Sequence, residues 1–327
     1  MRLVFLGTTD FAAAILERLA QSGAHRPALV LTRPDRPRGR GRKLASPPVA
    51  ERARSLGIAL EQPERINDEQ TVELIASAQP DAVVVCAFGA LIKEPLLSAY
   101  ELLNVHPSLL PRWRGAAPIE RAIIAGDRET GVSILRLTAG LDSGPVCLAR
   151  GEPIADDDTY GSLAARLCAL SAELLLRVLD LTAARTPPAF VEQAEDGVTY
   201  AEKIEADDRT LDPSRPAVEL ERVVRALQPH IGARVELADG TMLGVQQAAL
   251  LGEQEPADVA PSAPPAIVPG APVVDSARRS LGIVERDGRL LLQCAPGVLE
   301  LRVVQPPGGR AMDAAAYLRG RGLPVRP

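Results

Sequence analysis

The chain has 327 residues, of which 46% are hydrophobic and 24% charged, and its formal net charge is −5 at pH 7. These values are typical of a globular protein that buries a substantial interior, and the length suits two domains better than one core. No apolar run in the sequence approaches transmembrane length, so we do not expect a membrane-spanning protein. The four cysteines form no CxxC pair and the N-terminus lacks a signal-peptide core. We therefore expect a cytoplasmic protein with reduced thiols.

The first half of the chain alternates apolar runs with helical patterns. Asp10 is expected to cap the first helix and Gly23 to end it. Two further helical patterns follow, around residues 48–56 and over 68–78. Strands alternating with helices of about ten residues predict βαβ units and a parallel sheet, which binds ligands at the carboxyl ends of its strands. The runs that predict strands are residues 2–6, 28–32, 58–63, 81–88, 102–106 and 131–137.

The first predicted strand leads into GTTDFA, a glycine turn before a helix. A dinucleotide-binding turn needs a second and a third glycine, so that a pyrophosphate can approach the backbone. GTTDFA lacks both of them. A nicotinamide-dependent oxidoreductase is therefore a remote alternative.

After the second predicted strand comes RPDRPRGRGRK, residues 33–43, with six basic side chains in eleven residues. Charge runs of this kind are usually solvated loops. This one, however, lies at the predicted ligand-binding edge of the sheet, and its side chains can contact phosphates if the segment is extended. We expect it to bind nucleic-acid phosphates through Arg33, Arg36, Arg38, Arg40, Arg42 and Lys43.

Three polar residues follow two later strands. Asn104 and His106 are two apart at the end of a strand, so both side chains project to the same side. A carboxamide donor beside an imidazole is suited to acyl transfer, in which an oxyanion is stabilised and a proton is moved. If the next strand is parallel, Asp142 reaches the same edge and can orient His106. Each residue alone has a structural role by default, as we expect for His25 and His230, but the three together favour catalysis.

The second half has a different character. Residues 186–216 are polar and proline-bearing without periodicity, which indicates a linker. A helix is predicted over 218–227, because its apolar residues share one face. Short β-like segments follow, two of them ending in Asp-Gly turns typical of hairpins. We expect a small β-barrel preceded by a helix, with residues 255–272, which contain six prolines, as a solvated loop.

The run NVHPSLLPRWRGAAPI (104–119), followed by GVSILRLTAGLDSGPV (131–146), resembles the formyltransferase family that uses 10-formyltetrahydrofolate. The similarity continues in TRPDRPRGRGRKLASPPV, VVVCAFGALI, VTYAEKI and VQPPGGRAM, and so covers nearly the whole chain in the same order. It implies an α/β fold with a Rossmann-like formyltransferase domain at 1–187 and a linker at 188–208. It also implies a C-terminal β-barrel of the oligonucleotide-binding type at 209–327.

The resemblance also implies a reaction: formyl transfer from 10-formyltetrahydrofolate to the methionine of initiator methionyl-tRNA, for translation initiation. Asn104, His106 and Asp142 would be catalytic, and no metal is implied. Around LQPHIGARVEL (227–237) the chain departs from the aromatic residues that the family often has, so no tRNA contact is carried over there. We expect a monomer. The folate pocket would be lined by Phe88, Gly89, Leu91, Ile92, Ser108, Leu109, Leu110 and Pro111.

Two alternatives remain open from the sequence. A related enzyme that formylates a small amine, or that hydrolyses the folate, would share Asn104, His106 and Asp142 but would not need the basic segment or the second domain. A non-catalytic RNA-binding protein on a degenerate enzyme fold is the other alternative. The intact set of three polar residues argues against it.

Overall fold

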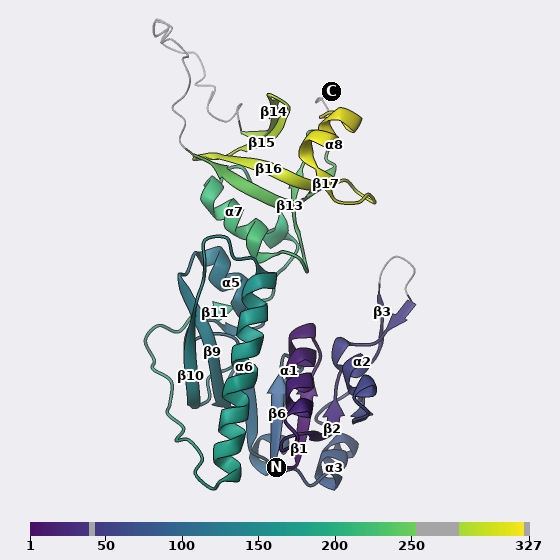
Figure 1. Ribbon diagram of the computed structural model, residues 1–327, viewed down its shortest axis with the longest axis vertical. Helices are drawn as coiled ribbons and strands as arrows, with labels where there is room; N and C mark the ends of the chain where they lie inside the picture. Colours follow the sequence, from purple (N-terminus) through teal and green to yellow (C-terminus); the bar gives the residue numbers. More distant parts are fainter. Residues whose placement is uncertain (39–42, 253–280, 324–327) are drawn as a thin grey trace, which may run out of the picture. The chain divides into compact units, whose positions relative to one another are not determined.

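The structure is a computed structural model that describes residues 1–38, 43–252 and 281–323 (Figure 1). Its chain divides into two compact units. The first unit consists of Met1–Ala122, Asp127–Asp156 and Ser162–Lys203. The second unit takes up Ile123–Gly126, Asp157–Gly161 and the described residues from Ile204 onward.

A seven-stranded sheet forms the centre of the first unit (Figure 1). Its strand order is β10-β9-β7-β6-β1-β2-β5, and all neighbours from β7 to β5 pair in parallel. The predicted α/β architecture with a mostly parallel sheet is confirmed. The strands are β1 Leu3–Gly7, β2 Pro27–Leu31, β5 Ala59–Glu61, β6 Ala82–Cys86, β7 Leu102–His106, β9 Glu129–Arg136 and β10 Val146–Pro153.

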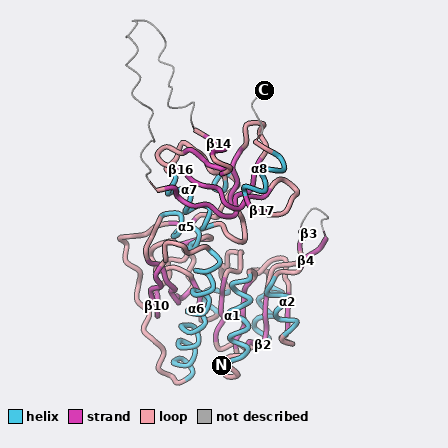
Figure 2. The backbone as a smooth tube through the Cα atoms, turned by 45° about the horizontal axis from the view of Figure 1, so that its top comes forward, coloured by secondary structure: helices cyan, strands magenta, loops and turns pink. Residues whose placement is uncertain are grey.

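Helices cover both faces of this sheet. On one face, alternate strand residues such as Leu6 and Val83 form an apolar cluster with Ile75 of α3 and Leu96 of α4. On the other face, α1 and α6 lie side by side (Figures 1 and 2). The long helix α6 is not among the predicted elements. The helices are α1 Asp10–Gln21, α2 Pro48–Ser55, α3 Glu69–Ser77, α4 Leu96–Ala99, α5 Pro118–Ala125 and α6 Tyr160–Ala183.

The prediction that Asp10 caps the first helix is wrong by one residue. Thr9 is the N-cap, because its backbone is extended and its Oγ1 accepts a hydrogen bond from the Ala12 N–H at 3.3 Å. Asp10 is instead the first helical residue, where a carboxylate interacts favourably with the positive end of the helix dipole. Gly23, with a φ of +68°, follows the helix end as predicted.

The direction predicted for the strand before Asp142 is also wrong. β9 runs antiparallel to β7, with His106 opposite Ser133 and Leu103 opposite Arg136. β10 then runs antiparallel to β9. An apolar run that is buried on both faces carries no information about its direction, so the sequence alone did not exclude this arrangement. The loop between β9 and β10, rather than a parallel strand, brings Asp142 to its place.

Two small sheets complete the first unit. The antiparallel pair of β3 (Arg36–Arg38) and β4 (Lys43–Ala45) forms the base of a hairpin that projects beyond α2 in Figure 1. A parallel pair joins β8 (Arg114–Gly115) to β11 (Tyr200–Ala201). β11 lies in the stretch that was expected to be a linker, so part of that stretch pairs with the first unit.

The second unit is an antiparallel, curled sheet with helices α7 (Ala217–Ala226) and α8 (Ala314–Arg321) packed on a common core. The Asp-Gly pairs at 239–240 and 287–288 join β12 to β13 and β14 to β15, as their hairpin signal predicted. The predicted β-barrel-like second domain with a preceding helix is confirmed. Its strands are β12 Ala233–Glu236, β13 Met242–Leu251, β14 Gly282–Arg286, β15 Arg289–Gln293, β16 Val298–Gln305 and β17 Met312–Asp313.

A short 3-10 helix, η1 (Asp207–Arg209), precedes α7. The proline-rich segment 255–272 lies outside the described residues. Of the helices in the described ranges, none has both the length and the apolar composition required to cross a bilayer.

Candidate active site

The candidate site lies at the carboxyl end of β7. Leu102, Asn104 and His106 alternate with their neighbours and therefore share one face of the sheet. Leu102 belongs to the apolar cluster on that face, together with Val83 and Val85 of β6. Beyond Leu102 the same face carries two polar side chains, Asn104 and His106. They are 7% and 4% exposed, respectively. The strand thus carries a carboxamide and an imidazole out of the core to the edge at which a parallel sheet binds ligands.

Asp142 meets both of these side chains. Its Oδ1 accepts a hydrogen bond from Asn104 Nδ2 at 3.0 Å, and its Oδ2 accepts one from the Gly115 N–H at 2.9 Å. His106 Nδ1 lies 3.6 Å from Oδ2. The carboxylate is 12% exposed, so these contacts are largely shielded from water. The three residues predicted to act together are in contact, although Asp142 arrives by a returning loop.

The hydrogen bonds of His106 define which ring nitrogen is free to react. Nε2 lies 2.8 Å from the Trp113 carbonyl oxygen, which can only accept, so Nε2 carries a hydrogen. Nδ1 faces the Asp142 carboxylate at 3.6 Å, a distance beyond a good hydrogen bond. Nδ1 is therefore the nitrogen that can exchange a proton with a third group beside Asp142.

The Trp113 carbonyl is held by contacts that the sequence did not indicate. Asp127 accepts a hydrogen bond from Trp113 Nε1 at 2.8 Å and binds the Arg112 guanidinium through two bonds of 2.7 and 2.6 Å. These bonds to Asp127 raise the pKa of Arg112. The Trp113 N–H donates to Thr199 Oγ1 at 2.9 Å. Trp113 has a φ of +63°, a backbone conformation that is rare for residues other than glycine. Its backbone N–H and its indole Nε1 hold the residue in place through Thr199 and Asp127.

Gly115 has a backbone conformation and surroundings that only glycine tolerates. Its φ is +124°, and a Cβ at this position would lie 2.7 Å from the Ala201 carbonyl oxygen. We expect Gly115→Ala to reduce the free energy of unfolding by about 1–3 kcal/mol and to lower kcat, because the N–H that binds Asp142 would move. Urea unfolding measures the first effect and steady-state turnover measures the second.

Gly57 supplies the control for that substitution. Its φ is also positive, at +63°, but a Cβ there meets nothing within 4 Å. Gly57→Ala should therefore show only the smaller cost of the backbone conformation, about 1 kcal/mol, with kcat unchanged. Equal effects of the two substitutions on kcat would show that the position of the Gly115 N–H has no importance for the reaction.

The residues predicted to line a folate pocket separate into two groups. Phe88, Ile92 and Ser108 are buried, and Ser108 Oγ donates to the Arg112 carbonyl at 2.6 Å. Leu91, in contrast, is 58% exposed. Leu141, which was not among the predicted residues but precedes Asp142 in the chain, is 56% exposed. The remaining predicted residues are exposed or partly exposed: Gly89, Leu109, Leu110 and Pro111.

A pocket of about 420 Å³ lies at the carboxyl ends of β1, β2 and β6. It brings together the predicted phosphate-binding residues Arg33 and Arg36 with the predicted folate-site residues Phe88 and Gly89. Lys43 is exposed on β4 of the same hairpin. Arg40 and Arg42 lie outside the described residues, and of Arg38 only the strand is described. The other lining residues include Thr8, Thr9, Ser46 and four prolines, at positions 34, 37, 47 and 48.

The base of the hairpin is braced by hydrogen bonds. Gln62 Nε2 donates to the Arg33 carbonyl at 3.0 Å and to Asp35 Oδ1 at 2.7 Å. Ser46 Oγ donates to Asp35 Oδ2 at 3.0 Å. The bonds from Gln62 and Ser46 lower the pKa of Asp35. The basic segment therefore leaves the sheet from a fixed position.

Comparisons with known proteins identify the family of the chain. Residues 1–179 match the sequence model described as "Formyl transferase", and residues 203–322 match that of "Formyl transferase, C-terminal domain". The chain belongs to the formyl transferase family.

Relatives of this formyl transferase match over nearly their full length. A protein of Halorhodospira halophila named methionyl-tRNA formyltransferase is 42% identical over 326 residues, which is 98% of this chain and 97% of the relative. A protein of the same name from Methylococcus capsulatus is 42% identical over 327 residues, 99% of this chain and 98% of the relative. One from Neisseria meningitidis is 37% identical, with the same two coverages.

Solved structures share the fold of this formyl transferase. A HypX variant from Aquifex aeolicus superposes with a TM-score of 0.64 at 18% identity, covering 99% of this chain and 48% of the other. The chain thus spans about half the length of HypX. An N-formyltransferase from Helicobacter canadensis, in complex with folinic acid and dTDP-3-aminofucose, superposes with a TM-score of 0.61 at 14% identity. The match covers 92% of this chain and 98% of the other. At these identities the likeness shows the fold alone.

The other histidines of this formyl transferase are engaged elsewhere. His25 is buried, with Nε2 2.8 Å from Asp180 Oδ1, and His230 stacks on Tyr160 with ring centroids 3.7 Å apart. In the described part of the chain, no group of three or more histidine, cysteine or acidic side chains is placed to hold a metal ion.

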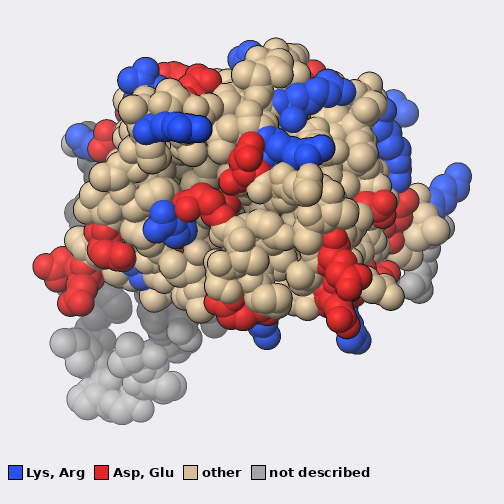
Figure 3. Space-filling view, turned by 90° about the horizontal axis from the view of Figure 1, so that it is seen from below, with Lys and Arg blue, Asp and Glu red and all other residues tan. Residues whose placement is uncertain are grey.

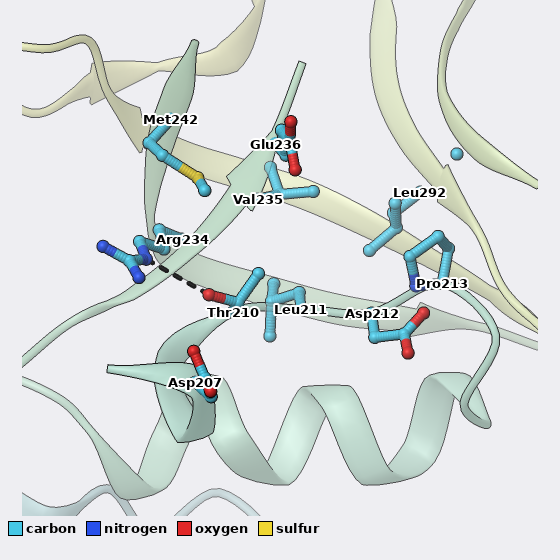
Figure 4. A pocket seen from close by; sticks show the side chains of 11 residues that line it. Asp207, Thr210, Leu211, Asp212, Pro213, Arg234, Val235, Glu236, Met242 and Leu292 are labelled. Carbon is cyan, nitrogen blue, oxygen red and sulfur yellow. Dashed lines mark hydrogen bonds between the residues drawn. The ribbon is translucent and has the colours of Figure 1, made fainter. Parts of the chain in front are cut away.

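A second pocket of about 540 Å³ lies in the second unit beside β12 (Figure 4). Asp207, Asp212 and Glu236 line it, against the single cation Arg234. Arg234 Nε already donates to Thr210 Oγ1 at 3.2 Å, as Figure 4 shows. Three carboxylates around one engaged guanidinium disfavour anionic ligands such as phosphates, so this pocket does not compete with the site on the first unit.

Proposed function

We propose that this formyl transferase transfers the formyl group of 10-formyltetrahydrofolate to the α-amino group of methionine on initiator methionyl-tRNA. It would do so in the cytoplasm, as a monomer, for translation initiation. The observation that carries the proposal is the contact of Asn104, His106 and Asp142 at the carboxyl end of β7. The relatives named methionyl-tRNA formyltransferase, which align over nearly the whole chain, support the choice of acceptor.

The proposed reaction uses the free hydrogen-bonding capacity of the three side chains. The neutral amine attacks the formyl carbon, the bond from that carbon to N10 breaks, the amine loses a proton and N10 gains one. Asn104 Nδ2 has two hydrogens, of which one binds Asp142 and the other can donate to the developing oxyanion. Asp142 would accept the amine proton, directly or through water. His106 Nδ1 lies beside Asp142 Oδ2, so it would receive the proton that leaves the amine and then donate it to the oxyanion or deliver it to N10.

The folate would bind against the exposed apolar side chains near these residues. Leu91 and Leu141 are large, exposed and apolar, and Leu141 precedes Asp142 in the chain, so both offer apolar surface that a ligand could cover. We propose that they contact the ring system together with Gly89 and the segment 109–111. Phe88, Ile92 and Ser108 would shape the pocket through the backbone and from behind.

The tRNA would be bound by the basic hairpin and by the second unit. Because the chain is net acidic, phosphate recognition requires a local positive field. Acidic and basic side chains are interspersed on the face shown in Figure 3, without a broad field of one sign. Arg33 and Arg36, which line the pocket at the carboxyl ends of β1, β2 and β6, and the exposed Lys43 would supply that field. Arg38, Arg40 and Arg42 belong to the same basic segment of the sequence. The β-rich second unit would serve as the tRNA-binding domain.

A formylation assay tests the proposal. Purified protein and 10-formyltetrahydrofolate are incubated with initiator methionyl-tRNA, elongator methionyl-tRNA, or free amines and amino-sugar nucleotides. We expect rapid formylation of the initiator only. Preferred formylation of a small amine would assign the protein to another member of its family. Folate hydrolysis without transfer would indicate a hydrolase, and no folate binding in calorimetry would indicate a non-catalytic protein.

We expect the double substitution Arg33→Gln with Arg36→Gln to raise the KM for tRNA by about 5- to 20-fold. It should also reduce the slope of log KM against log salt by about 1–2. The reason is that tRNA binding releases fewer counterions when phosphate contacts have been removed. The kcat at saturating tRNA and the KM for the folate should stay unchanged. Steady-state kinetics at several salt concentrations measure both quantities.

The double substitution Arg150→Gln with Arg166→Gln removes the same charge from the same unit. These two arginines pair with Glu173 and Glu152 and do not line the hairpin pocket. An equal rise in KM for this control would mean that total charge, rather than the position of Arg33 and Arg36, determines tRNA binding.

A further inference from the structure

Residues 191–201, which we name the strap, lie between the two regions that match the family models, 1–179 and 203–322. The strap is not a free linker. Val191 exchanges two backbone hydrogen bonds with Val146, of 2.8 and 2.9 Å, next to the Asp142 loop. At the other end of the strap, β11 pairs with β8, and Thr199 accepts from the Trp113 N–H.

Gln193 is the residue of the strap with the most contacts to the catalytic loop. Its Nε2 donates to the Asp142 carbonyl at 2.7 Å and to the Gly144 carbonyl at 2.8 Å. Its Oε1 accepts from Arg114 Nε at 3.0 Å and from Nη2 at 2.7 Å. One side chain thus uses both of its donor hydrogens and both of its acceptor positions to join the Asp142 loop to the segment that contains Gly115.

The Asp142 loop has a backbone that needs such support. Asp142 has a φ of +45°, a conformation that residues other than glycine rarely adopt unless their surroundings impose it. Asn104 and the Gly115 N–H bind the carboxylate, but neither of them binds the Asp142 backbone. Gln193 does so at the carbonyl of Asp142 itself. A rotation of this peptide would move the carboxylate relative to His106.

We infer that Gln193 is a positioning residue for Asp142 and that the strap is therefore part of the catalytic centre. The inference rests on the proposed function, in which Asp142 accepts the amine proton. Misplacement of a reacting group by about 1 Å can lower a rate by about 100-fold. The effect of Gln193 should accordingly appear in kcat rather than in substrate binding.

The test compares Gln193→Glu with Gln79→Glu. Glutamate can still accept from Arg114 but can no longer donate to the carbonyls of Asp142 and Gly144. Gln79 Oε1 likewise accepts from an arginine, Arg2 Nη1 at 3.2 Å. We expect Gln193→Glu to lower kcat by about 10- to 100-fold, with both KM values within threefold of wild type, and Gln79→Glu to match wild type. If Gln193→Glu does not fold, Gln193→Met, which retains the volume, replaces it.

A double variant separates positioning from a general structural role. In an Asp142→Asn background, Gln193→Glu should cause less than a threefold further loss in single-turnover rate, because the group that it positions no longer accepts the proton. A full 10- to 100-fold further loss would overturn the inference, and so would a wild-type kcat for Gln193→Glu alone. Failure of the wild-type protein to formylate initiator methionyl-tRNA in the same assay would instead contradict the proposed function.

Discussion

Replacing Asp142 with asparagine is expected to lower kcat for formylation by about 10²- to 10⁴-fold, because the proton acceptor is lost. The structure adds a second reason. Both carboxylate oxygens of Asp142 accept from N–H groups, of Asn104 and of Gly115. An asparagine can accept at only one of these positions, and its own NH₂ group would face a donor at the other. Single-turnover formylation with saturating folate measures the loss.

The protein should remain folded when this substitution is made. The lost hydrogen bond reduces the free energy of unfolding by about 1–3 kcal/mol, which urea unfolding can detect. Asp239→Asn makes the same change of charge in an exposed turn, where Asp239 Oδ1 accepts from the Thr241 N–H. This control should keep the wild-type rate. A folded Asp142→Asn variant with a near-normal single-turnover rate would contradict the proposed role of Asp142.

Asn104→Ala is expected to lower kcat by about 10²- to 10³-fold, the usual loss when a preorganised oxyanion donor is removed. Asn104 is 7% exposed and its Nδ2 already binds Asp142, so the amide is held in place before a substrate arrives. The KM for the folate should change little, because the donor acts on charge that develops only in the transition state. Steady-state kinetics separate kcat from KM.

A double substitution at positions 104 and 142 sharpens this prediction. The two side chains are in contact at 3.0 Å, so their effects on kcat should combine to less than their product. Fully multiplicative losses would indicate that Asn104 and Asp142 act independently. A loss in Asn104→Ala that appears only in the KM for the folate would assign Asn104 to ligand binding instead of to the chemical step.

Much of the fold, and the proximity of Asn104, His106 and Asp142, could be predicted from the sequence. Asn104 and His106 lie on the same face because strand periodicity requires it, and a strand followed by turn residues locates them at a ligand-binding edge. The Asp-Gly turns predicted two hairpins of the second unit for a local reason, since these residues adopt positive φ readily. Periodicity and turn chemistry are local properties, and the sequence expresses them directly.

The features that the sequence did not reveal depend on contacts between distant segments. The direction of β9 is set by its pairing with β7, which no residue within β9 specifies. Thr9 and Asp10 are both good capping residues, and only the backbone decides between them. Gln193 lies in a polar stretch without periodicity, and its partners, such as Asp142 and Arg114, are 51 and 79 residues away in the chain. Nothing near Gln193 marks it as different from other surface glutamines.

The pairing of β11 with β8 bears on how this family can exchange its domains. A boundary placed at residue 179, where the first family model ends, would detach Gln193, Thr199 and the Ala201 carbonyl that faces Gly115. Recombination of catalytic and C-terminal modules between relatives, in evolution or by engineering, should therefore tolerate a junction after Lys203, where the first compact unit ends. Junctions between 180 and 202 should yield chimaeras that fold in both modules and yet turn over slowly.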